Sequence, residues 1–196
     1  MFRRFMLTAA TSALIAGGAA ADYTLTILHT NDIHSRVESI NKYDSICNAD
    51  GEAEGKCFGD VTMGEVLTVL PFQNTLSTFF VTGATIVAAL ENGVSKMEEG
   101  AGRFPQVAGM SFTVTPSAEA GSRISNVMVG GSAIDLNKTY GVVSNNYVRN
   151  GGDGYKMFRD AENAYDYGPD LADVTAEYMA KGGSYTAYTD GRITVK

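Results

Sequence analysis

The residues best suited to metal chemistry stand together in the stretch LHTNDIHSR, which runs from Leu28 to Arg36. Asp32 and His34 are two positions apart, and residues with this spacing at the end of a strand point to the same side. A carboxylate beside an imidazole suits Zn²⁺, Mn²⁺ or Co²⁺. The bare triplet also arises by chance, with His34 on an ordinary loop.

A two-metal hydrolase needs about six or seven protein ligands, several of them usually histidine. His29 is the only other histidine of the chain. The remaining ligands of such a site are therefore missing, unless carboxylates replace every histidine.

A second group of residues suits the binding of a planar ligand. Phe72 follows a proline in VLPFQN, while Tyr147 and Asp153 belong to NNYVRNGGDGY. Two aromatic rings that face each other can sandwich a nucleobase, worth about 1–3 kcal/mol per stacked base. A nearby carboxylate can accept hydrogen bonds from ribose hydroxyls or base N–H groups. The alternative is that the aromatic residues belong to the core or its rim and that GGDG is only a turn.

The amino terminus has the pattern of a secretory signal peptide over residues 1–21. Arg3 and Arg4 precede an apolar run that ends in three alanines before Asp22, as in an exported protein. A membrane anchor is the alternative, but the apolar run is shorter than the roughly 18 residues needed to span a bilayer. We therefore expect export to the periplasm or beyond, and no membrane span in the mature chain.

Charge argues against a nucleic acid polymer as partner. Loss of two arginines with the leader leaves 13 basic and 22 acidic residues of the original 15 and 22, a net charge of about −9. Such a surface repels nucleic acid and anionic lipid.

The two cysteines, Cys47 and Cys57, lie in the polar segment CNADGEAEGKC. The exported context permits a disulfide, and a small loop-closing bridge is the favoured interpretation. A pair of metal thiolates would need two further ligands nearby.

Periodicity predicts a mixture of strands and helices. A capping-box pattern at Thr62 and Glu65 predicts a short helix that ends near Pro71. Thr82 is expected to cap a helix that reaches Met97, and Pro169 to open a helix that ends at Gly182 and Gly183. Strands are expected at 23–29, 75–82, 109–116, 123–131, 139–147 and 192–196.

This order predicts an α+β fold, because helices are interspersed among the strands without strict alternation. We expect residues 22–59 to be a remnant of another domain with a cysteine-bounded loop, and residues 60–196 to form one α+β domain with a mixed sheet.

Four stretches in this order resemble the 5'-nucleotidase family, the exported two-domain metallophosphatases that include the UDP-sugar hydrolases. They are LTILHTNDIHSR, TMGEVLTVLPFQNTL, GAGRFPQVAGM and SNNYVRNGGDGYKMF. The resemblance implies that residues 22–59 are a remnant of the catalytic metallophosphatase domain. It also implies that residues 60–196 are the carboxy-terminal, substrate-binding domain.

The resemblance also implies roles for single residues. Asp32 and His34 match the first metal ligands of the family. Phe72 and Tyr147 match the aromatic pair that stacks on the base, with Tyr147 where phenylalanine is usual. Asp153 matches the acidic residue that hydrogen-bonds the nucleoside. Two further residues match positions near the base and on the loop that lines its pocket: Asn74 and Gly102.

The chain departs from the family between its front motif and the helix near residue 62. In the family that interval holds the other metal ligands, an Asn-His catalytic pair and a phosphate-binding arginine. Here Phe58, Gly59 and Asp60 stand in its place. We therefore expect nucleoside binding without phosphatase activity, because catalysis by preorganised charge needs the ions and the arginine. The alternatives are a working enzyme of nucleotide catabolism and a fragment without function.

Overall fold

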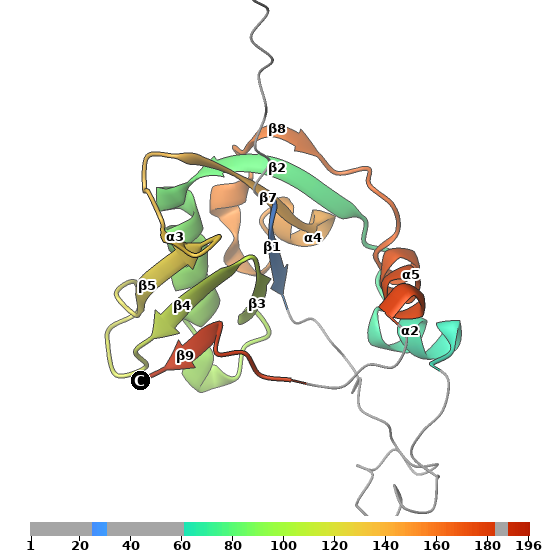
Figure 1. Ribbon diagram of the computed structural model, residues 1–196, viewed down its shortest axis with the longest axis horizontal. Helices are drawn as coiled ribbons and strands as arrows, with labels where there is room; N and C mark the ends of the chain where they lie inside the picture. Colours follow the sequence, from blue (N-terminus) through green and yellow to red (C-terminus); the bar gives the residue numbers. More distant parts are fainter. Residues whose placement is uncertain (1–24, 31–60, 183–187) are drawn as a thin grey trace, which may run out of the picture.

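The computed structural model describes residues 25–30, 61–182 and 188–196, and shows an α+β fold with two sheets (Figure 1). The expected α+β class is confirmed, and parallel and antiparallel pairs occur in both sheets. The expected leader, the metal ligands and the cysteines lie outside the described residues: 1–21, Asp32, His34, Cys47 and Cys57.

The larger sheet has five strands in the order β3-β1-β7-β2-β8. β1 runs antiparallel to β3 and parallel to β7, so the front strand lies inside the sheet rather than beside it. β2 lies antiparallel to both β7 and β8. The strands are β1 (Leu25–Thr30), β2 (Leu76–Thr82), β3 (Pro105–Ala108), β7 (Thr139–Asn145) and β8 (Glu162–Tyr165).

The smaller sheet has four strands in the order β6-β5-β4-β9. The chain passes from β3 into this sheet through Gly109 alone, whose φ of 72° allows the abrupt turn that most side chains would resist. The strands are β4 (Met110–Val114), β5 (Ile124–Val129), β6 (Ser132–Ala133) and β9 (Ile193–Val195).

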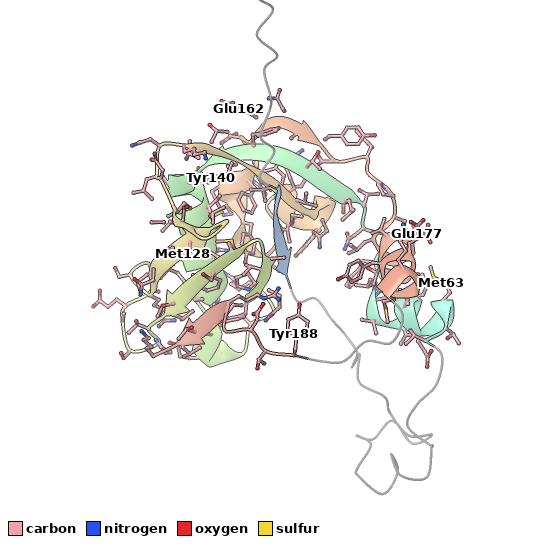
Figure 2. All side chains as sticks on the ribbon, viewed as in Figure 1. Met63, Met128, Tyr140, Glu162, Glu177 and Tyr188 are labelled. Atoms are coloured by element: carbon pink, nitrogen blue, oxygen red, sulfur yellow. The ribbon has the colours of Figure 1, made fainter. Side chains whose placement is uncertain are left out.

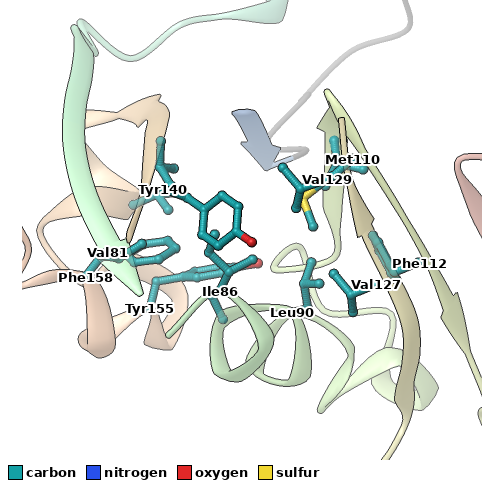
Figure 3. Packing of buried hydrophobic residues seen from close by; sticks show 14 of the residues in the cluster. Val81, Ile86, Leu90, Met110, Phe112, Val127, Val129, Tyr140, Tyr155 and Phe158 are labelled. Atoms are coloured by element: carbon teal, nitrogen blue, oxygen red, sulfur yellow. The ribbon is translucent and has the colours of Figure 1, made fainter. Parts of the chain in front are cut away.

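The central helix α3 (Gly83–Val94) contacts strands of both sheets and supplies much of the core. Thr82 caps it, as expected, by accepting a hydrogen bond from the backbone of Thr85. Ile86 and Leu90 point from α3 toward side chains of β4, β5 and β7 (Figure 3). Burial of each such side chain is worth about 1.5–3 kcal/mol, so α3 holds the two sheets together.

Two further helices, α2 (Met63–Val69) and α5 (Leu171–Gly182), contact each other at one end of the molecule, where Met63 and Glu177 lie (Figure 2). The expected capping box at α2 is present: Thr62 accepts from the backbone of Glu65, and the Glu65 carboxylate accepts from the backbone of Thr62. Helix α5 begins later than expected, because the Asp170 side chain accepts the first free N–H groups.

Short elements account for most other differences from expectation. Met97 does not continue α3 but begins a separate 3-10 turn, η1 (Met97–Glu99). The sequence did not predict β3, β6 or β8, which are four residues or fewer and too short for a clear alternation. Also unpredicted are α4 (Asn146–Arg149), η2 (Gly152–Gly154) and η3 (Lys156–Phe158). Within the described ranges, no helix has the length and apolar character of a membrane span.

Candidate functional site

Tyr147 and Asp153, both singled out from the sequence, lie together at the end of β7. The short helix α4 carries Tyr147 and is capped by Asn145, whose side chain accepts from the backbone N–H of Val148 at 2.8 Å. The Tyr147 hydroxyl donates to Asp153 Oδ1 at 3.0 Å. Tyr147 keeps 46% of its surface exposed. The pair therefore offers an aromatic face and a carboxylate at one place on the surface.

The glycines of the GGDG loop allow this arrangement. A Cβ atom on Gly152 would lie only 2.4 Å from Cε1 of the Tyr147 ring, so the ring rests directly against the loop backbone. Asp153 itself has a φ of 48°, in the left-handed region. That conformation costs a residue with a side chain about 1–2 kcal/mol, so the surrounding contacts must hold it in place.

Asn92 supplies such a contact, and Arg103 in turn contacts Asn92; neither residue was singled out from the sequence. Asn92 of α3 donates through Nδ2 to the Asp153 carbonyl at 3.1 Å. Arg103 donates through Nη1 to Asn92 Oδ1 at 3.5 Å. Asn92 lies 61 positions from Asp153, and no spacing rule links residues so far apart. The sequence therefore carried no signal for this contact.

Gly102 is exposed and lies beside Arg103 in the turn before β3. The Arg103 carbonyl accepts a hydrogen bond from the buried Tyr155 hydroxyl at 2.7 Å. Burial raises the pKa of Tyr155 well above its usual range, with the nearby Asp153 charge as a second cause. Tyr155 therefore stays protonated and ties the Gly102 turn to the segment that follows the GGDG loop.

Phe72 and Asn74 lie in the segment that leads into β2. Phe72 is 49% exposed. The Asn74 backbone accepts from the backbone N–H of Leu171 at 2.8 Å. Next in the chain, Thr75 exchanges hydrogen bonds with Asn146, the neighbour of Tyr147. β2 and β7 thus bring the segments that carry the two predicted aromatic residues to the same end of the larger sheet.

An ion pair supports this end of the sheet. Arg149 donates through Nε to Asp166 Oδ1 at 2.7 Å and through Nη2 to Oδ2. Ser77 of β2 donates to the same Oδ1 at 2.8 Å. The side chains of Arg149 and Asp166 are only 14% and 20% exposed. The hydrogen bond from Arg149 is the main cause that lowers the pKa of Asp166, opposed by burial.

The expected metal ligands, Asp32 and His34, lie outside the described residues. Among the residues that are described, no group of three or more His, Cys, Asp or Glu side chains is arranged to hold a metal ion.

Comparison with known proteins agrees with the fold. The family model for the 5'-nucleotidase C-terminal domain matches residues 33–160. The chain therefore belongs to the 5'-nucleotidase C-terminal domain family, which confirms the family suggested by its motifs.

Two curated relatives illustrate the similarity. A trifunctional nucleotide phosphoesterase of Bacillus subtilis is 40% identical over 155 residues, which are 76% of this chain and 11% of that protein. An NAD 5'-nucleotidase of Haemophilus influenzae is 34% identical over 165 residues, or 76% of this chain and 27% of that protein.

Solved structures show the same fold. A 5'-nucleotidase precursor from Thermus thermophilus matches with a TM-score of 0.74 and 36% identity, covering 89% of this chain and 32% of that one. The Haemophilus influenzae NAD nucleotidase matches with a TM-score of 0.67 and 24% identity, covering 88% of this chain and 30% of that one. This chain thus spans less than a third of each of these relatives.

Proposed function

We propose that this chain binds nucleosides or nucleoside 5'-phosphates at the surface formed by Tyr147 and Asp153. The observation that carries the proposal is the hydrogen bond between these two side chains, beside a half-exposed aromatic ring. The ring can stack on a base, and the carboxylate can accept from ribose hydroxyls or base N–H groups. Phe72, on the neighbouring segment, is the second stacking residue of the proposal.

The proposal is binding without hydrolysis. Its support is the sequence, which holds only two histidines and lacks the family's Asn-His pair and phosphate-binding arginine. In the family the first ligands, matched here by Asp32 and His34, contribute to a site for divalent ions such as Zn²⁺, Mn²⁺ or Co²⁺. We propose that the same two residues form an incomplete metal site in this chain. We also propose that the chain is exported and binds its ligand in the periplasm.

The test is calorimetric titration of adenosine into the purified chain, with D153N and D160N as matched variants. Asp160 is exposed and lies on the same stretch of chain. We expect saturable binding by the wild type and by D160N. D153N is expected to bind about tenfold more weakly, because it loses one hydrogen bond to a charged group. Equal binding by all three proteins would contradict the role of Asp153, and no binding would refute the proposed function.

Hydrolysis is tested separately by phosphate release from 5'-AMP with added Mn²⁺, Co²⁺ or Zn²⁺. We expect no release above a protein-free control. Metal-dependent release that Asp32→Ala abolishes would instead establish the second candidate function, a phosphatase that completes its metal site with other carboxylates or a second subunit.

A further inference from the structure

The side chain of Asn92 joins the central helix to both loops of the candidate site. Its Nδ2 donates to the carbonyl oxygen of Asp153 at 3.1 Å, while its Oδ1 accepts from Nη1 of Arg103 at 3.5 Å. A carbonyl only accepts and a guanidinium only donates, so these two partners determine which way the amide points. Asn92 thereby links α3 to the GGDG loop and to the Gly102 turn.

The GGDG loop lies against Asn92 as closely as its backbone allows. A Cβ atom on Gly154 would come within 2.6 Å of Asn92 Oδ1 and 3.2 Å of Arg103 Nη1. Gly154 also has a φ of 85°, which glycine adopts without penalty. Both the conformation and the contact therefore require glycine here, and the loop packs directly against Asn92 of α3.

Asp153 lies between two contacts that restrain its opposite ends. Asn92 holds its main-chain carbonyl, and the Tyr147 hydroxyl holds Oδ1 of its carboxylate. Among the described residues, no side chain or backbone group donates to Oδ2. Asp153 adopts a left-handed φ of 48°. A residue in this strained conformation persists only where the surrounding contacts hold it there.

We propose that Asn92 is a positioning residue of the nucleoside site. By holding the Asp153 carbonyl it keeps Asp153 in the left-handed conformation, in which the carboxylate meets Tyr147 and presents Oδ2 to the hydroxyl groups of a ribonucleoside. The inference rests on the proposed function, in which Asp153 accepts hydrogen bonds from the ribose hydroxyls.

Loss of Asn92 has a specific consequence. Asp153 can then relax toward the common negative φ region, which turns its carboxylate away from the ligand. Tyr147 lies on α4 and not on the loop that Asn92 holds, so the contact to the base persists while the contact to the sugar is lost. Preorganisation of this kind contributes to affinity because the free site need not be ordered upon binding.

The experiment compares two ligands and three proteins. Calorimetry measures the dissociation constants of adenosine and of 2',3'-dideoxyadenosine, which lacks both sugar hydroxyls, for the wild type, N92A and S95A. Ser95 is the matched control, because it contacts both Asn92 and Arg103 but not Asp153. We expect the wild type and S95A to prefer adenosine. We expect N92A to bind adenosine about tenfold more weakly and dideoxyadenosine within twofold of the wild type.

A merely structural role predicts a different result. If N92A weakens both ligands equally, or leaves their ratio unchanged, the inference is overturned. N92D has the same shape as asparagine but replaces the donor with an acceptor. It is expected to lose the same preference, and it serves as the test if N92A does not fold.

Hydrogen exchange at the Tyr155 amide, which donates to the Gly152 carbonyl across the loop, reports on the loop without any ligand. We expect faster exchange in N92A and not in S95A. If the wild type binds neither nucleoside but N92A still exchanges faster at Tyr155, the proposed function fails, while the role of Asn92 in holding the Asp153 backbone is confirmed. Unchanged exchange at the Tyr155 amide in N92A overturns the role of Asn92 in holding the Asp153 backbone.

Discussion

Substitution of Asp166 by asparagine tests whether its ion pair with Arg149 stabilises the fold. Asp166 accepts two hydrogen bonds from Arg149 and one from Ser77. Removal of one partner from a buried pair costs about 3–5 kcal/mol, and exposed pairs cost less than about 1 kcal/mol. With the side chains 14% and 20% exposed, we expect D166N to lose about 3 kcal/mol. For a chain of this size, that corresponds to a fall in Tm of roughly 9 °C.

The pH dependence provides a second measure of the same pair. Arg149 lowers the pKa of Asp166 from its ordinary value of 3.8 in the folded chain. The stability that the pair contributes is therefore fully present above the unfolded pKa, and it is lost as pH falls through the lower folded pKa. The difference in Tm between wild type and D166N is thus expected to be constant from pH 7 to about pH 5 and to shrink below pH 4.

The assay is thermal unfolding followed by circular dichroism, with D160N as the control that removes an exposed carboxylate. D160N is expected to melt within about 2 °C of the wild type, as surface substitutions usually do. A D166N protein that melts as high as D160N at pH 7 would refute the view that this partly buried pair stabilises the fold.

Three further substitutions test the site and the core by calorimetric titration of adenosine or by thermal unfolding. G152A places a methyl group against the Tyr147 ring, at 2.4 Å in the present geometry, so we expect about tenfold weaker adenosine binding; unchanged affinity would mean that the ring is not part of the site. Y155F removes the bond to the Arg103 carbonyl and is expected to cost about 1–3 kcal/mol of stability; an unchanged Tm would show that this bond adds nothing. L90A empties a fully buried position of the core and is expected to cost about 2–5 kcal/mol, so a smaller loss would mean that the sheets close over the cavity.

Local chemistry made much of the fold predictable. The capping box at Thr62 and the cap at Thr82 are interactions between residues three apart, so the sequence contains both partners side by side. Longer strands such as β2 and β7 are recognised in the sequence by the alternation of apolar and polar residues and by their β-branched residues. The helix that was expected to reach Met97 ends at Val94, because helix ends depend on tertiary contacts and local caps as much as on periodicity.

Residues that bring chemistry by their type were also visible in the sequence. Tyr147 and Asp153 are six positions apart in a glycine-rich segment, so a short loop suffices to bring them together. The proposed roles of Asn74 and Gly102 came from family motifs alone, and that of Phe72 came from its residue type as well; all three roles stay predictions. The metal site expected at Asp32 and His34 is likewise a prediction.

By itself, the sequence determined the family, the α+β class and the presence of Tyr147 and Asp153 in one short glycine-rich segment. Only the tertiary structure decided that β1 lies between β3 and β7, and that Asn92 holds Asp153 from 61 positions away. The physical reason is that a sequence pattern records which face of an element is apolar and which residues cap it. Contacts between distant segments form only when the sheets and α3 pack together, and they depend on the shape of the whole core.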